Sequence, residues 1–80
     1  MRWRLMYAPT VISYLYSLRL AGHALRQEIQ AIAEEPEPWL EDLAVENRSN
    51  RYERLIRGHW VGYEVDREDK TLRVIYIQAL

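Results

Sequence analysis

Hydrophobic and polar positions alternate over residues 2–7, where basic or polar side chains are interleaved with apolar ones. A period of two is typical of a strand with one buried face. The side chains expected to point inward are Trp3, Leu5 and Tyr7. We therefore predict a half-buried first strand.

Two stretches with a helical period follow this strand. Pro9 suits the first turn of a helix, where its missing N–H has no helical partner, and an apolar stripe then continues until Gly22. We predict the first helix over about residues 10–21. A second stripe begins at His23 and ends at Pro36, because proline cannot continue a helix. We expect the two helices to pack antiparallel to each other.

The first predicted helix is apolar over most of its circumference. Three large side chains widen its apolar stripe: Tyr14, Tyr16 and Leu20. A helix of this kind is either deeply buried or covered by a second partner. The pattern leaves both explanations open.

A period of two returns in the last third of the chain, together with β-branched and aromatic residues. The predicted strands are residues 51–56, 59–65 and 71–77. A turn at Arg57 and Gly58 and a charged turn at residues 66–70 join them, which predicts an antiparallel meander. Residues 39–45 are predicted to form one more helical turn or an anchored loop.

Strict alternation assigns side chains to the two faces of these strands. In the third strand, one face carries His59, Val61, Tyr63 and Val65, and the other carries Trp60, Gly62 and Glu64. In the last strand, one face carries Leu72, Val74 and Tyr76, and the other carries Thr71, Arg73, Ile75 and Ile77.

The order β-α-α-β-β-β predicts an α+β fold in which a two-helix hairpin packs on one face of an antiparallel sheet. A chain of 80 residues can bury one hydrophobic core but not two, so we expect a single domain over residues 1–80. Hydrophobic residues make up 49% of the chain, which argues against a disordered binding segment.

The composition excludes several kinds of site. The absence of cysteine rules out disulfides, thiolate metal sites and a cysteine nucleophile. His23 and His59 are far apart in the chain, with no third ligand at a metal-binding spacing. The three glycines form neither a phosphate-binding loop nor a dinucleotide fingerprint. We therefore expect no metal and no cofactor.

The N-terminal half predicts neither a membrane span nor a secretion signal. Arg19 and Arg26 interrupt its apolar stretches well short of the roughly 18 uninterrupted apolar residues that a spanning helix needs. The first apolar stretch is broken by Pro9 and lacks a following small-residue cleavage site. With the absence of cysteine, this leads us to expect a cytoplasmic protein without a membrane partner.

Charges are segregated along the chain, although the formal net charge is only -1. Every charged residue from Glu28 to Asn47 is acidic. Four arginines then follow in quick succession: Arg48, Arg51, Arg54 and Arg57. Such a pattern indicates either a solvated surface or a dedicated binding surface, and both interpretations stay open.

The last strands carry a family resemblance. Residues 52–77 resemble the C-terminal strands of the RelE/ParE toxins, and the matching residues align without a gap. These are Tyr52, Val61, Tyr63, Glu64, Val65, Asp66, Glu68, Thr71, Leu72, Arg73 and Val74. The front half is similar in layout, since Tyr7, Ala8 and Pro9 end the first strand where the family has an aromatic-Ser-Pro sequence.

This resemblance implies the toxin half of a type II toxin–antitoxin pair, held inactive by a cognate antitoxin. Branches of the family either cut messenger RNA in the ribosome or poison DNA gyrase. The leading interpretation is inhibition of translation by ribosome-dependent mRNA cleavage, with the antitoxin, the ribosome and mRNA as partners. The residues expected to face the antitoxin are Tyr14, Tyr16 and Leu20.

Nucleases of this family use basic groups on the concave face of the sheet to hold phosphate, and a further group to activate the 2′-hydroxyl. The family's usual arginine after the Gly-Asp-Tyr turn falls on Trp60, and the usual Gly-His-Arg extension with a later tyrosine is missing. The candidate catalytic residues are therefore Arg54, Arg57 and Arg73. The candidates for RNA or partner binding are Arg51, His59, Trp60 and Tyr76.

Four alternatives remain open. Glu64 and Arg73 can form a simple cross-strand ion pair, and strand alternation argues against all the candidates sharing one face. Trp60 and the missing extension favour a catalytically inactive protein-binding module of the same fold, whereas a gyrase-directed inhibitor would act by protein contact. A homodimer through the first helix or the edge of the last strand is a further hypothesis.

Overall fold

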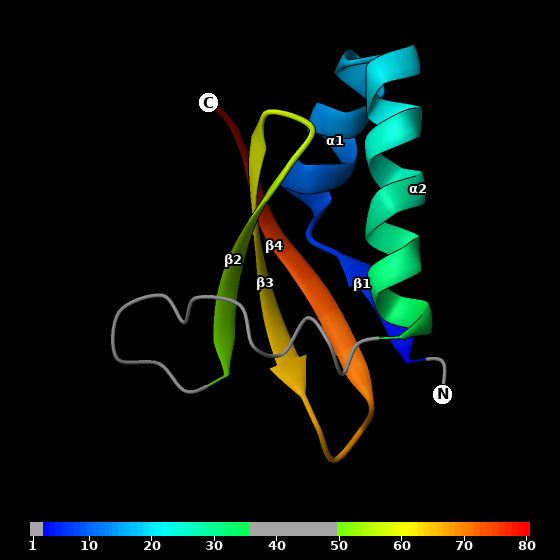
Figure 1. Cartoon of the computed structure of the whole chain (residues 1–80), viewed down its shortest axis with the longest axis vertical. Helices are drawn as coiled ribbons and strands as arrows, with labels where there is room; N and C mark the ends of the chain where they lie inside the picture. Colours follow the sequence, from blue (N-terminus) through cyan, green and yellow to red (C-terminus); the bar gives the residue numbers. More distant parts are fainter. Residues whose placement is uncertain (1–2, 36–49) are drawn as a thin grey trace.

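The computed structural model describes residues 3–35 and 50–80, and the prediction for residues 39–45 lies outside them. The elements follow the predicted order β-α-α-β-β-β (Figure 1). They are β1 Arg4–Tyr7, α1 Pro9–Ser17, α2 Leu20–Glu34, β2 Arg51–Ile56, β3 His59–Asp66 and β4 Thr71–Ala79. The predicted α+β fold class, with two helices packed on a sheet, is confirmed.

The four strands lie in the order β1-β4-β3-β2. β2, β3 and β4 form the predicted antiparallel meander. β1 lies parallel to β4, with Leu5 opposite Leu72 and Tyr7 opposite Val74, so the sheet is mixed where a wholly antiparallel one was expected. Alternation identifies a strand but not its direction, and the helices and the meander supply the long connection that parallel neighbours require.

The break between the helices lies at Leu18 and Arg19. Arg19 has a φ of 55°, a left-handed conformation, and α2 begins directly after it. Gly22 lies inside α2, where an added Cβ would be 2.0 Å from the carbonyl oxygen of Leu15. The prediction that Gly22 ends the first helix is therefore wrong, because this glycine permits a close helix contact.

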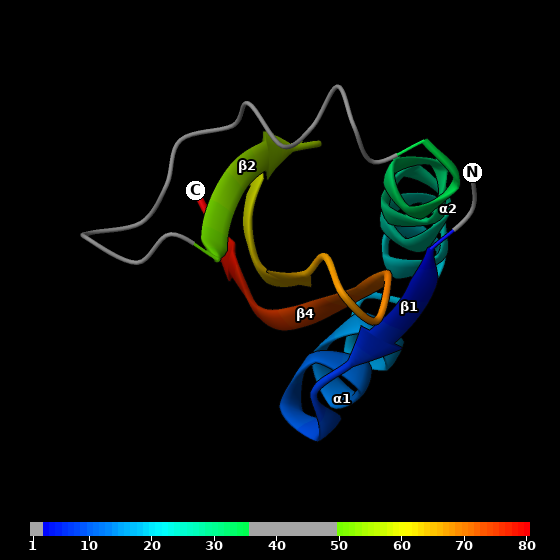
Figure 2. The same cartoon turned by 90° about the horizontal axis from the view of Figure 1, so that it is seen from below.

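The hydrophobic core lies between the helix pair and one face of the sheet, which curves from β1 round to β2 (Figure 2). The helices contribute Val11, Leu15, Leu25, Ile29 and Ile32, and the two central strands contribute Val61, Tyr63, Val65, Leu72 and Val74. Trp3 is 4% exposed, and Leu5 and Tyr7 pack against the same cluster. The predicted inward face of the first strand is thus confirmed.

A β-bulge in β4 changes which side chains share a face. Tyr63 is opposite Val74 and Gly62 is opposite Tyr76, so Ile75 is skipped in the register. The bulge moves Tyr76 to the face opposite Val74 and turns Ile77 toward the core. The prediction that Tyr76 shares a face with Val74 is therefore wrong, because strict alternation fails at an inserted residue.

Candidate functional site

The face of the sheet that points away from the core is called the outer face below. The register places on it Arg4, Met6, Arg51, Glu53, Leu55, Trp60, Gly62, Glu64, Arg73 and Tyr76. Arginine, glutamate and aromatic side chains are therefore mixed on this surface. It contains four of the seven residues nominated for chemistry or RNA binding.

Tyr76 crosses the outer face from β4 to β2. Its ring covers Gly62, where an added Cβ would lie 2.0 Å from the ring carbon Cε2. Its hydroxyl donates a hydrogen bond to the carboxylate of Glu53 on β2. Burial, followed by the hydrogen bond and the negative charge of Glu53, raises the pKa of Tyr76 to about 12. Tyr76 is therefore a protonated hydrogen-bond donor at neutral pH, held in place by two strands.

Arg51 and Glu64 form an ion pair on the same face. The Arg51 Nη2 atom donates a hydrogen bond of 3.0 Å to Glu64 Oε2, and about 30% of each side chain is exposed (29% and 30%). Glu64 is also the register partner of Arg73, but no ion pair joins these two residues. Arg73 is exposed and forms no ion pair with a residue of the described ranges. It is therefore available to an anionic ligand.

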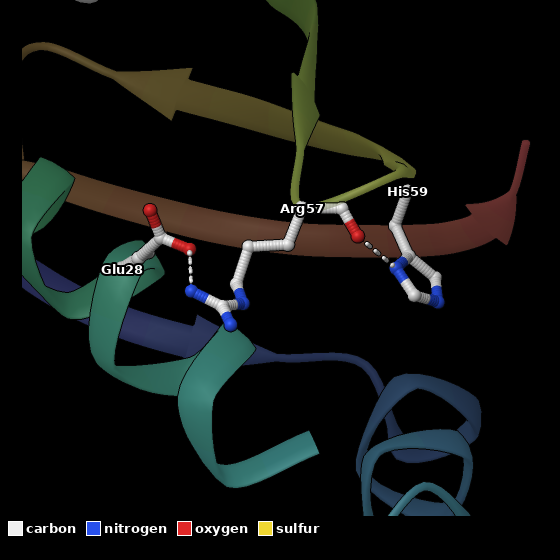
Figure 3. Close-up of polar contacts among 3 residues, drawn as sticks. All are labelled: Glu28, Arg57 and His59. Atoms are coloured by element: carbon white, nitrogen blue, oxygen red, sulfur yellow. Dashed lines mark hydrogen bonds and ion pairs between the residues drawn. The ribbon is translucent and has the colours of Figure 1, made fainter. Parts of the chain in front are cut away.

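The three candidate catalytic arginines lie in three different places. Arg73 is on the outer face, whereas Arg54 is opposite Val61 on the core-facing side of β2. Arg57 lies in the turn between β2 and β3, and its Nη1 atom is 3.5 Å from Oε2 of Glu28 on α2 (Figure 3). The structure thus does not bring Arg54, Arg57 and Arg73 together around one phosphate.

His59 packs on the side of the sheet that faces the helices. Its Nδ1 atom donates a hydrogen bond of 3.1 Å to the carbonyl oxygen of Arg57, because a carbonyl oxygen can only accept (Figure 3). The His59 ring also packs edge-to-face with the ring of Tyr14 on α1, with 6.1 Å between the ring centroids. The imidazole therefore helps to hold the hairpin turn against the helix pair.

Trp60 and Leu55 are cross-strand neighbours on the outer face. Leu55 is 47% exposed and Trp60 is partly exposed. A partly exposed indole can stack on a nucleic-acid base or pack against a partner protein. Sequence reasoning nominated Trp60 but missed Leu55 and Glu53, whose pairing with Trp60 and Gly62 becomes visible only with the strand register.

The residues nominated to face an antitoxin differ in exposure. Tyr16 is 73% exposed and Leu20 is 86% exposed, whereas Tyr14 is partly buried against His59. Tyr16 and Leu20 therefore remain open to a partner. Tyr14 already has an internal packing role.

The described residues provide no other obvious centre for chemistry. Within ranges 3–35 and 50–80, no group of three or more histidine, aspartate or glutamate side chains is arranged to hold a metal ion. None of the described helices is long and apolar enough to cross a membrane. The outer face and the exposed surface of the helix pair are thus the two candidate sites.

No protein-family model and no curated protein matches this sequence. Several solved structures of toxins and their complexes do match its fold. The archaeal RelE–RelB complex of Pyrococcus horikoshii matches with a TM-score of 0.79 and 21% identity, over 99% of this chain and 96% of that chain. The RelBE2 toxin–antitoxin complex of Mycobacterium tuberculosis matches with a TM-score of 0.77 and 13% identity, over 100% of both chains.

A mutant of the Escherichia coli toxin RelE in complex with a peptide of the antitoxin RelB is also similar. Its TM-score is 0.76 at 18% identity, over 100% of this chain and 85% of that chain. These similarities confirm the RelE-like fold predicted from residues 52–77 and from the layout of the front half.

Proposed function

We propose that this chain is the toxin-like component of a type II toxin–antitoxin module and that a cognate antitoxin binds its helix pair. The observation that carries the proposal is the RelE-like fold over the whole length of the chain. Among the matched structures, the Pyrococcus horikoshii and Mycobacterium tuberculosis complexes contain RelE-type and RelB-type proteins together, and a third structure holds a RelB peptide. The function of those proteins is what we extend to this one.

The helix surface supports binding of a partner. Tyr16 and Leu20 leave most of their area in water, at 73% and 86% exposure, and Ile12 on α1 is 42% exposed. Large apolar side chains gathered on the surface of a small protein mark a contact site for another protein. A partner that covers them removes apolar area from water, which favours binding.

Inhibition of translation through contact with ribosome-bound mRNA is the activity that we attach to this proposal. Arg73 is exposed on the outer face, and Trp60 on the same face offers an aromatic ring. Arginine binds phosphate and an aromatic ring stacks on an unpaired base. We assign phosphate binding to Arg73 and base stacking to Trp60.

A catalytically inactive protein-binding module of the same fold is the second candidate. The separation of Arg54, Arg57 and Arg73 favours it, since cleavage of RNA needs cationic groups that converge on the reacting phosphate. The pairing of Arg51 with Glu64 and of Tyr76 with Glu53 also favours the inactive module. Such a module would bind a partner without stopping growth.

Induced expression in a bacterial host distinguishes these functions. Growth, pulse-labelled protein synthesis and the DNA-damage response are followed together for the parent chain, Trp60→Ala and Arg73→Ala. Glu68→Gln, in the exposed turn after β3, is the control. Rapid loss of protein synthesis, relieved by the first two substitutions and not by the control, is the expected result.

Two other outcomes contradict that expectation. DNA damage with continued translation would identify a gyrase-directed inhibitor. Unimpeded growth, with the protein shown to be folded and abundant, would identify the inactive binding module.

A further inference from the structure

A pocket of about 240 Å³ opens between α1, α2 and the end of β1. Its apolar lining includes Ile12 and Leu15 from α1, and Gly22 contributes backbone from α2. Tyr16 and Ile12 extend the apolar surface from the pocket into solvent, at 73% and 42% exposure. The hollow is therefore continuous with the exposed surface of the helix pair.

The charged side chains that line this pocket are both cationic. They are Arg19 and Arg26, and none of the lining residues is acidic. In the part of the chain that the structure describes, neither Arg19 nor Arg26 forms an ion pair. The Arg26 guanidinium lies over the ring of Tyr7, 5.7 Å from its centroid, and its N–H groups can donate hydrogen bonds to an anion. Two arginines beside an apolar floor, in a lining without an acidic residue, complement an occupant that is both apolar and acidic.

A third observation concerns the hydroxyl of Tyr7, a residue that also lines the pocket. This hydroxyl is buried and has no hydrogen-bond partner among the described residues. Burial raises the pKa of Tyr7, and the neighbouring Arg26 guanidinium lowers it in part. A neutral buried hydroxyl without a partner is rare in folded proteins, because its hydrogen bond to water is lost without replacement. A carboxylate that enters the pocket beside Arg26 would reach this hydroxyl after a small side-chain shift and would then accept the missing hydrogen bond.

We propose that this pocket binds an acidic segment of a partner polypeptide, with one large apolar side chain against Ile12 and Leu15 and a carboxylate held by Arg19 and Arg26. The identification of this partner as the antitoxin rests on the proposed function. The pocket is smaller than the usual 300–1,000 Å³ of small-molecule sites. The apolar surface of Tyr16 and Leu20 continues beyond it, which favours a polypeptide over a small molecule.

The first test probes the pocket itself with 3-phenylpropionate, which joins an apolar ring to a carboxylate, and with 3-phenylpropionamide, its uncharged analogue. Amide chemical shifts of the isotope-labelled chain are followed during titration. The acid is expected to shift Gly22, His23 and Arg26 and to bind about tenfold more tightly than the amide, since a hydrogen bond to a charged group is worth more than a neutral one. Equal binding of acid and amide, or shifts centred elsewhere, would overturn the proposal.

Substitutions of the lining arginines test which side chains hold the carboxylate. Arg19→Gln with Arg26→Gln is expected to remove the preference for the acid, while Arg4→Gln, an exposed arginine outside the lining of this pocket, keeps it. Ile12→Ser is expected to weaken acid and amide equally, because it changes only the apolar wall. If the double variant kept the preference, another group would hold the carboxylate and the assignment would be wrong.

The second test uses the small partner that the toxin–antitoxin proposal predicts to be encoded next to this chain, with its binding to the chain measured by calorimetry. The Arg19→Gln, Arg26→Gln variant is expected to weaken the complex at least about tenfold. An unchanged affinity would overturn the docking inference and leave the toxin–antitoxin proposal standing. No binding by the parent chain, together with unimpeded growth, would overturn the toxin–antitoxin proposal and the polypeptide occupant alike, whatever the first test finds for the acid.

Discussion

The hydroxyl of Tyr76 donates a hydrogen bond to the carboxylate of Glu53 across the backbone of Gly62. The two residues belong to β4 and β2, which are not neighbours in the sheet. Only a residue without a side chain between them leaves room for the tyrosine ring. This contact joins three strands on the face opposite the core, and several measurable properties depend on it.

Gly62→Ala is expected to destabilise the protein. The added Cβ would meet the Tyr76 ring at 2.0 Å, so the ring must leave its position and its bond to Glu53. Forcing a methyl group into a packed site costs about 1 to 3 kcal/mol of unfolding free energy. Urea denaturation of Gly62→Ala in the parent and in a Tyr76→Ser background measures this. The loss should shrink in the second background, and equal losses in both would show that the ring is not the obstacle.

The ionisation of Tyr76 predicts a pH dependence at the alkaline end. Its pKa is raised to about 12 from the ordinary 10.0, so the folded state holds the phenol proton more tightly than the unfolded state does. The resulting stability is fully present below pH 10 and is lost as the pH rises toward 12. Carbon NMR titration of the tyrosine rings should show two late-titrating residues, Tyr76 and Tyr7, because burial also raises the pKa of Tyr7. Glu53→Gln should lower the pKa of Tyr76 alone, and Tyr76→Phe should remove one late signal and leave that of Tyr7; two late signals that survive Tyr76→Phe would contradict the assignment.

Gly22→Ala tests the contact between the helices. Alanine is normally preferred over glycine within a helix by up to about 1 kcal/mol, which on propensity alone predicts stabilisation. Here the Cβ would lie 2.0 Å from the backbone oxygen of Leu15, so a net loss of about 1 to 3 kcal/mol is expected. Ala21→Gly, at an exposed position of the same helix, measures the propensity effect alone. Stabilisation by Gly22→Ala would mean that the helices are not in close contact there.

Arg57→Asn is expected to give a more stable protein than Arg57→Ala. Arg57 and Gly58 form a two-residue hairpin turn with φ of 48° and 77°, and asparagine tolerates this left-handed conformation better than alanine does. Neither variant keeps the ion pair with Glu28, which is exposed and is worth less than about 1 kcal/mol. The comparison therefore isolates the backbone, and thermal unfolding should favour asparagine by about 1 kcal/mol. Equal stability would indicate that the turn relaxes in the variants.

Periodicity alone was sufficient to predict the order of helices and strands, because each element has one buried face. It did not predict the parallel pairing of β1, since hydrogen bonding between distant segments leaves no local pattern. The bulge at Ile75 was missed for a related reason, as a skipped residue is defined by its partner strand. Gly22 was misread because a glycine that ends a helix and one that permits helix contact look alike in a sequence.

Alternation within single strands did not predict how the candidate residues are arranged across the sheet. The register places Trp60 and Arg73 on the same face, a relationship that the sequence had left open. The partner of Tyr76, Glu53, was missed, although a glycine within a strand is a signal of close approach by another group. The cationic pocket formed by Arg19 and Arg26 was also missed, because both arginines were considered only as interruptions of an apolar stretch.

The position of β1 bears on how this chain folds. Its neighbour in the sheet is β4, so Leu5 acquires Leu72 beside it only when segments from opposite ends of the described chain have met. Contacts between such distant residues raise the contact order, and folding rates fall as contact order rises. We expect folding to be one slow cooperative event, because the sheet is complete only when β1 has paired with β4.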